Sequence, residues 1–191
     1  MNADPSIRDI LDFWFLPISD PDHGKSREVW WKPPPEFDAE VRERFSAVLD
    51  RAVAGGLDPW QKSPDGALAL ILLCDQFTRH AHRKTARAFA GDAKALQTAQ
   101  IAVARSFPAA FNATMRLFFY MPFQHSEAIA DQELGCALFA AFEDEELMKH
   151  ALGHRDLIAR FGRFPHRNDV LGRACTADEL EYLKTAERYG Q

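Results

Sequence analysis

Apolar side chains recur along most of the chain at the three- and four-residue spacing of an α-helix. The clearest stripe consists of Phe37, Val41, Phe45, Val48, Leu49 and Ala52. These positions fall on one face of a single helix, and Gly55 and Gly56 predict its end. The next apolar stretch, residues 67–77, is hydrophobic on nearly every side, so we expect a helix in the centre of the fold.

Capping residues mark where several helices should begin or end. Ser63 and Pro64 predict the start of the central helix, and Thr176 with Glu179 has the spacing of a capping box at the last one. Pro122 predicts the end of a helix over residues 109–120. The other expected helices cover residues 7–15, 92–106, 126–142 and 144–161.

The aliphatic composition agrees with a helical fold. The chain has 29 Ala and 18 Leu against 13 Val and Ile together, and β-branched residues favour strands over helices. No stretch shows the strict apolar and polar alternation of a strand. The sequence therefore predicts an all-α protein of about eight helices in one domain, residues 1–191, built as a bundle or as a solenoid of helix pairs.

The net charge and the cysteine content limit which binding partners and which cellular compartment we expect. A formal net charge of −5 disfavours a general nucleic-acid binder, which needs a basic surface to neutralise phosphates. Three widely spaced cysteines build no disulfide framework, which indicates a reducing, cytoplasmic compartment. The longest apolar run, Ala67 to Cys74, has eight residues, whereas a membrane span needs about 20. The amino terminus lacks the pattern of a signal peptide, so we expect neither nucleic acid nor membrane as a partner.

Asp75, Gln76, Arg79 and Arg83 are the first candidate ligand-binding residues. Asp75 and Arg79 are four residues apart and therefore share one face of the central helix. An ion pair there would be partly buried, and burial of charge is costly unless both partners are satisfied. One interpretation is a structural pair that fixes the helix against its neighbour. The other is an arginine that binds an anion.

The segment His125-Ser126-Glu127 holds candidate catalytic groups. Adjacent side chains on a helix diverge, so His125 cannot easily activate Ser126 as a nucleophile. We expect Ser126 to cap the start of a helix. Glu127, in the first turn, would interact favourably with the positive end of the helix dipole. His125 and Glu127, together with His166, are candidates for general acid–base catalysis if a pocket lies before this helix.

Two basic segments stand out from the acidic chain. Residues 79–94 hold five Lys and Arg against one Asp, and residues 154–173 hold five Arg against two Asp. The second segment includes Arg163, Arg167 and Asn168 in an irregular loop, and Arg carries a fork of donors that suits carboxylate or phosphate. If the two segments converge, they form an anion-binding pocket. Alternatively, these arginines pair with the acidic residues at 127–133 and 143–146.

No metal or cofactor is predicted. His150 and His154 are four residues apart, a spacing at which two imidazoles can share a metal ion. Zinc needs a third protein ligand, and the H-E-x-x-H signature is lacking, so we expect solvated or capping histidines instead. A glycine-rich phosphate loop, a nucleophile elbow and an EF-hand loop are also lacking.

Four segments together carry a family resemblance. They are WFLP with the WW and EFD that follow it (14–38), LLCDQFTRHAHRKTARAFAGDAKAL (72–96), FFYMPFQHSEAIADQE (118–133) and HRDLIARFGRFPHRNDVLGRACTADE (154–179). The combination resembles the bacterial domain-of-unknown-function family 924. The resemblance implies antiparallel helix pairs stacked in a tetratricopeptide-like superhelix, and it implies no established reaction. Thr78, His80 and Cys175 depart from the family pattern, which puts in doubt a role that depends on the family's usual Asn at position 80.

Three functions are compatible with these patterns. The preferred hypothesis is a binding module whose Arg- and His-lined groove takes an anionic small molecule or an acidic peptide. The second is a small-molecule hydrolase, or another acid–base enzyme, that uses the three catalytic candidates above. The third is an interaction or oligomerisation subunit with an aromatic patch of Trp14, Trp30 and Trp31.

Overall fold

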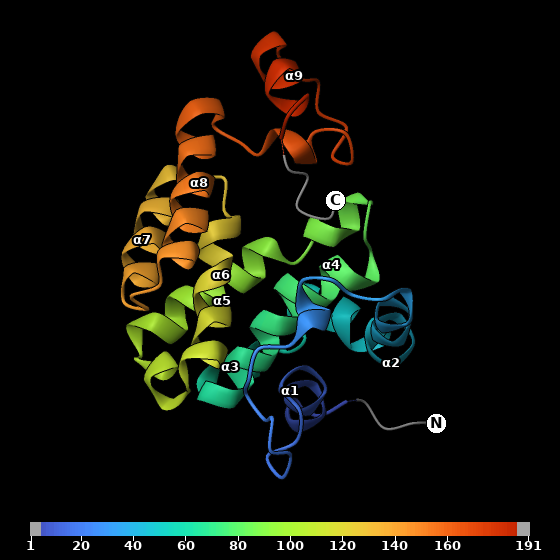
Figure 1. Ribbon diagram of the computed structural model, residues 1–191. Coiled ribbons are helices and arrows are strands. Elements are labelled where there is room, and N and C mark those ends of the chain that lie inside the picture. The colour runs from blue at the N-terminus through green and yellow to red at the C-terminus, as the bar shows by residue number, and fades with distance from the viewer. Residues whose placement is uncertain (1–4, 187–191) are drawn as a thin grey trace.

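The computed structural model describes residues 5–186, and all regular structure within them is helical, as the sequence predicts (Figure 1). Short 3₁₀ turns connect the longer elements. The α-helices are α1 (Ile7–Phe15), α2 (Pro35–Val53), α3 (Pro64–Ile71), α4 (Thr78–Ala81), α5 (Asp92–Ala104), α6 (Ala113–His125), α7 (Ile129–Ala140), α8 (Glu145–Phe161) and α9 (Ala177–Leu183). A π-helical segment, η3 (Leu72–Phe77), joins α3 to α4 without a break.

The helix starts follow the predicted caps. The Ser63 hydroxyl accepts a hydrogen bond from the Gly66 amide at the start of α3, where Pro64 holds the first position. Thr176 and Glu179 form the expected capping box at α9. Local side-chain chemistry therefore fixes where these helices begin.

The α3–η3 segment is the centre of the fold. Every residue from Gly66 to Thr78 is buried, and α3 packs against α1, α5 and α6 (Figure 1). The rings of Trp14 and Trp30 stack in this core at a centroid distance of 5.6 Å, and both are buried. The predicted tryptophan patch is therefore wrong as stated: covering these rings with apolar side chains is favourable, and only Trp31 of the three is exposed, at 52%.

A second hydrophobic cluster holds α6, α7 and α8 together. Its buried members are Leu117, Cys136, Phe139 and Ala151. These three helices follow one another in the chain and pack as neighbours, on one side of α3 and α5 (Figure 1).

Two predicted helix boundaries around residues 120–129 are wrong. Pro122 lies inside α6, which continues to His125. Phe118, Phe119 and Phe123 are fully buried on both sides of the proline, and their packing offsets the lost backbone hydrogen bond, which costs about 3 kcal/mol. Helix α7 begins at Ile129 with Ala128 as its N-cap, so the expectation that Ser126 caps this helix is also wrong.

None of the helices in the described residues combines the length and the apolarity needed to cross a membrane.

Candidate functional site

A cleft of about 380 Å³ lies between the central helix, the α6–α8 helices and the segment that follows α8. Two basic segments far apart in the sequence meet there, which is one of the two alternatives above: Arg79 comes from α4, Arg83 from the turn after it and Arg167 from the segment after α8. The other alternative, pairing with acidic residues at 127–133, holds for Arg173, which binds Glu127. Histidines from several elements also line the cleft: His80, His125, His150, His154 and His166. The cleft thus gathers five of the seven histidines of the chain.

The π-helical segment η3 places the polar residues at the base of the cleft. Its extra residue per turn shifts the register, and the Thr78 hydroxyl donates to the Cys74 carbonyl oxygen at 2.7 Å. Gly91 packs against the same carbonyl so closely that a Cβ there would lie 2.1 Å from the oxygen. Asp75 and Gln76 are both within this segment. Irregular helix geometry is frequent at functional sites, and the hydrophobic pattern alone did not predict it.

Asp75 is a fully buried carboxylate that orients His125. Its Oδ1 lies 2.6 Å from Nδ1 of His125, and Gln76 Nε2 donates to Oδ2 at 2.5 Å. Burial opposes ionisation, but His125 and Arg79 nevertheless hold the pKa of Asp75 well below its ordinary value. The charged carboxylate accepts from Nδ1–H, which leaves Nε2 of His125 as the nitrogen that can exchange a proton.

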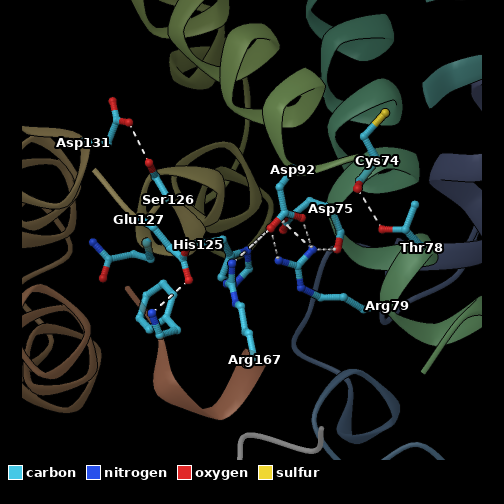
Figure 2. Close-up of polar contacts among 12 residues, drawn as sticks. Cys74, Asp75, Thr78, Arg79, Asp92, His125, Ser126, Glu127, Asp131 and Arg167 are labelled. Carbon is cyan, nitrogen blue, oxygen red and sulfur yellow. Dashed lines mark hydrogen bonds and ion pairs between the residues drawn. The ribbon is translucent and has the colours of Figure 1, made fainter. Parts of the chain in front are cut away.

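Arg79 and Arg167 share one carboxylate, that of Asp92 (Figure 2). Arg79 binds it through both terminal nitrogens, at 2.9 and 3.1 Å, and also pairs with Asp75 at 3.2 Å. Arg167 Nη1 lies 3.3 Å from Asp92 Oδ2. The predicted Asp75–Arg79 pair therefore exists, but the bidentate partner of Arg79 is Asp92.

Arg167 is a buried cation held between two aromatic rings. It is only 7% exposed, and its guanidinium carbon lies 4.8 Å from the Phe89 centroid and 4.5 Å from the Phe164 centroid. Among residues 5–186, no hydrogen-bond partner is placed at its Nε. Burial and the nearby Arg79 lower the pKa of Arg167 to about 10, which still leaves the group charged at neutral pH. Its hydrogen-bonding capacity is thus only partly used in the described structure.

Arg83 and His80 both contact Asp38 of α2. Arg83 Nε donates to Asp38 Oδ2 at 2.9 Å, and His80 Nδ1 lies 2.7 Å from Oδ1. Burial lowers the pKa of His80 despite this carboxylate. Burial opposes the ionisation of Asp38, but Arg83 and His80 hold its pKa below the ordinary value, so Asp38 stays charged. Arg83 and His80 line the cleft, whereas Asp38 does not.

Two half-buried histidines of the cleft resist protonation. Burial, reinforced by His125 and His166, lowers the pKa of His154 to about 3. Burial and Arg167 lower the pKa of His166 to about 4. The expectation of solvated or capping histidines is met by the exposed His150 but is wrong for His154, whose ring packs edge-on against Phe164 at 5.5 Å.

Glu127 anchors the segment that carries Arg167. Its carboxylate accepts from the Phe164 amide at 2.8 Å and from Arg173 at 2.6 and 3.0 Å. Arg173 and the Phe164 amide together hold the pKa of Glu127 below its ordinary value although burial opposes this. Glu127 therefore does not line the cleft but holds in place the segment that carries Arg167.

Arg163 and Asn168 also stabilise this segment. Arg163 binds Glu179 through two bonds, at 2.6 and 2.7 Å, which lower the pKa of Glu179 to about 2. Asn168 accepts from Arg173 Nε at 2.9 Å and donates to Cys175 Sγ at 3.3 Å.

The predicted site residues thus fall into three groups. Asp75 lies directly behind the cleft, and the segment anchors are Glu127, Arg163 and Asn168. The residues that line it are Gln76, Arg79, Arg83, His125, His166 and Arg167.

Sequence reasoning did not include several residues of the cleft in the site. They are Trp30, Trp31, His80, Phe89, His150, His154 and Phe164. The four-residue spacing of His150 and His154 was the one usable signal.

The lining of the cleft is cationic although the chain is acidic. Three arginines and five histidines line it, and within the described part of the chain no Asp or Glu does so. Among the same residues, no three His, Cys, Asp or Glu side chains are arranged to hold a metal ion. The chemistry that the lining offers is hydrogen-bond donation to an anion and proton exchange at imidazole.

The model of a family of bacterial proteins of unknown function, DUF924, matches residues 10–187. The chain belongs to this family. A protein of unknown function from Agrobacterium tumefaciens, a solved structure, is 38% identical to it. The match covers 94% of this chain and 97% of the other, with a TM-score of 0.83. None of the curated proteins is similar enough to count as a relative. Membership of DUF924 therefore establishes the family and the fold, and any function must be argued from the cleft.

Proposed function

We propose that this protein binds a small anionic molecule in the cleft, beside Arg167. The observation that carries the proposal is the buried Arg167 guanidinium, whose Nε–H has no hydrogen-bond partner in the described structure. A buried donor without an acceptor is unfavourable, and an anionic ligand beside this guanidinium would supply acceptors. Arg also presents paired donors that match carboxylate and phosphate.

The dimensions of the cleft favour a small molecule over an acidic peptide. Its volume of about 380 Å³ lies within the range of about 300–1,000 Å³ that is typical of small-molecule sites. Helices α6, α7 and α8 follow one another as packed neighbours, which supports the tetratricopeptide-like arrangement that the family resemblance implies. All three cysteines are free thiols, which supports a reducing, cytoplasmic setting.

A thermal unfolding screen tests anion binding. Inorganic phosphate and succinate, each added at constant ionic strength, should raise the melting temperature by several degrees at saturation, because a ligand of the native state stabilises it. Arg167→Gln should remove the shift. Arg155→Gln is the control, since Arg155 pairs with Asp156 on α8 and does not line the cleft. A wild-type protein that no anion stabilises would rule the proposal out, as would an undiminished shift in Arg167→Gln.

A second candidate function is general acid–base catalysis at His125. The specific observation is the 2.6 Å contact between its Nδ1 and the buried Asp75 carboxylate, an arrangement that orients an imidazole for proton transfer. No Ser, Thr, Cys or Tyr lines the cleft within residues 5–186. A hydrolytic reaction there would consequently use water as its nucleophile, with His125 as the base.

Hydrolysis of p-nitrophenyl phosphate and p-nitrophenyl hexanoate tests the catalytic candidate. We expect turnover that His125→Asn abolishes while phosphate binding persists. His150→Asn, which changes another histidine of the cleft without a carboxylate contact in the described structure, should retain turnover. Wild-type rates equal to the buffer rate would count against hydrolysis of both ester classes.

A further inference from the structure

Part of the cleft lining is an apolar wall. It is formed by Leu117 and Met121 of α6, Phe139 of α7, and Leu147 and Ala151 of α8. These residues belong to, or pack against, the second hydrophobic cluster. Met121 and Leu147 are half-buried and give the wall its accessible surface, whereas the other three are buried.

The two kinds of surface come from different elements. Arg79 belongs to α4, Arg83 to the turn after it and Arg167 to the segment after α8, whereas the residues of the apolar wall belong to α6, α7 and α8. A fully hydrated anion such as free phosphate could satisfy the arginines but would leave the apolar wall in contact with water. Removal of that wall from water is favourable and needs an apolar group on the ligand.

We propose that the ligand is an amphiphilic anion, with one carboxylate or phosphate head on an apolar body. This inference rests on the proposed anion-binding function. The head lies at Arg79 and Arg167, and the body lies along Met121, Leu147 and Ala151. Each methylene that the wall buries should tighten binding by roughly fourfold.

Affinity as a function of chain length tests this assignment. The dissociation constants of acetate, butyrate, hexanoate and octanoate are measured by isothermal titration calorimetry, with inorganic phosphate, butyl phosphate and hexyl phosphate as the second series. We expect the constant to fall by several-fold per methylene in at least one series. The series whose short members bind more tightly shows whether the head group is a carboxylate or a phosphate.

Two leucines of α8 provide a matched pair of variants. Leu147 lines the cleft, whereas Leu152 packs on the same hydrophobic cluster without lining it, and both are half-buried. Leu147→Gln should flatten the dependence on chain length and leave phosphate binding unchanged. Leu152→Gln should keep the full dependence.

The outcomes separate this inference from the proposed function. If phosphate and acetate bind but longer chains bind no more tightly, the amphiphilic ligand is excluded and the anion site stands. Equal chain-length dependence in the two leucine variants would also overturn the inference. If no member of either series binds, the anion-binding function itself fails.

Discussion

Asp75 occupies the interior with its carboxylate 1% exposed, and its charge depends on three neighbours: Gln76, Arg79 and His125. A buried charge of this kind is tolerated because each oxygen has a partner. Removal of one partner leaves the charge uncompensated at a place that water does not reach. The stability of the fold and the geometry of the cleft therefore depend on the same residues.

We predict that Arg79→Ala lowers the free energy of unfolding by about 2 kcal/mol or more, because Asp75 and Asp92 each lose a cationic partner. Urea denaturation measures the change. Arg87→Ala is the control: Arg87 pairs with Asp50 on the surface, where both side chains are more than 60% exposed, so the change should stay within about 0.5 kcal/mol. An unaltered midpoint for Arg79→Ala would mean that this pair adds nothing to stability.

Stability should decrease as the pH falls from about 6.5 towards 4. An unfolded histidine titrates near 6.5, whereas the pKa values of His154 and His166 are about 3 and about 4 in the fold. In this window the unfolded chain binds more protons than the folded one, which favours unfolding by up to about 1.4 kcal/mol per pH unit and histidine.

Urea denaturation at a series of pH values, with His154→Gln beside the wild type, isolates this contribution. The variant should lose stability less steeply between pH 6.5 and 4. His150→Gln, at an exposed position of the same helix, should follow the wild-type slope. Identical slopes in all three proteins would show that His154 titrates normally.

At the residue scale, the sequence predicted contacts between near neighbours and not between distant ones. The four-residue spacing of Asp75 and Arg79 was sufficient to predict their contact. Asp92 lies 13 residues beyond its partner Arg79, and His125 lies 50 residues beyond its partner Asp75, and no local pattern indicates either contact. Only the packing of α5 and α6 on the central helix brings these partners together.

At the scale of elements, the junction of η3 with the start of α5 is a close backbone contact. Gly91 precedes α5 and packs on the Cys74 carbonyl and Cα. This contact positions Asp92, the next residue, where it pairs with both Arg79 and Arg167.

We predict that Gly91→Ala destabilises the protein by about 1–3 kcal/mol, the typical cost of overpacking, because its Cβ would overlap backbone atoms of η3. Gly153→Ala is the matched control: Gly153 lies inside α8 with no foreign atom within 4 Å of a Cβ. That change should stabilise by roughly 0.5–1 kcal/mol, since alanine is the better helix former. Thermal or urea unfolding of both variants gives the comparison, and a neutral Gly91→Ala would mean that the junction can relax.

Helix starts were predictable because caps act through residues three or four apart, as Ser63 and Thr176 show. The end of α6 was not, because Pro122 is tolerated for a tertiary reason, the burial of Phe119 and Phe123 around it. The π-helical geometry of η3 also depends on tertiary packing, so residues 72–77 were predicted as ordinary helix.

At the scale of the whole molecule, the segment after α8 supplies Phe164, His166 and Arg167 to a cleft that residues of α4 also line. Glu127, at the junction of α6 and α7, holds this segment through Phe164 and Arg173. The convergence of the two basic segments was anticipated only as one of two alternatives. The charges of the two basic segments did not indicate that residues 163–173 would pack near the arginines of residues 79–83.

Glu127→Gln should weaken phosphate binding by about tenfold, because the loss of charge-assisted hydrogen bonds loosens the segment that carries Arg167. Calorimetric titration measures the dissociation constant. Glu146→Gln, which changes an exposed glutamate of α8 paired with Lys149, should bind phosphate as the wild type does. An unchanged constant in Glu127→Gln would show that Glu127 does not position Arg167.

Anion binding beside Arg167 is tested most directly by the guanidinium resonances themselves. In Arg163 and Arg173 the Nε–H groups donate to Glu179 and Asn168, whereas that of Arg167 has no partner in the described structure. During a phosphate titration followed by NMR, the Arg167 Nε–H signal should shift and saturate while the other two stay in place. Equal, unsaturable shifts at all three arginines, or none at Arg167, would contradict an anion site in the cleft.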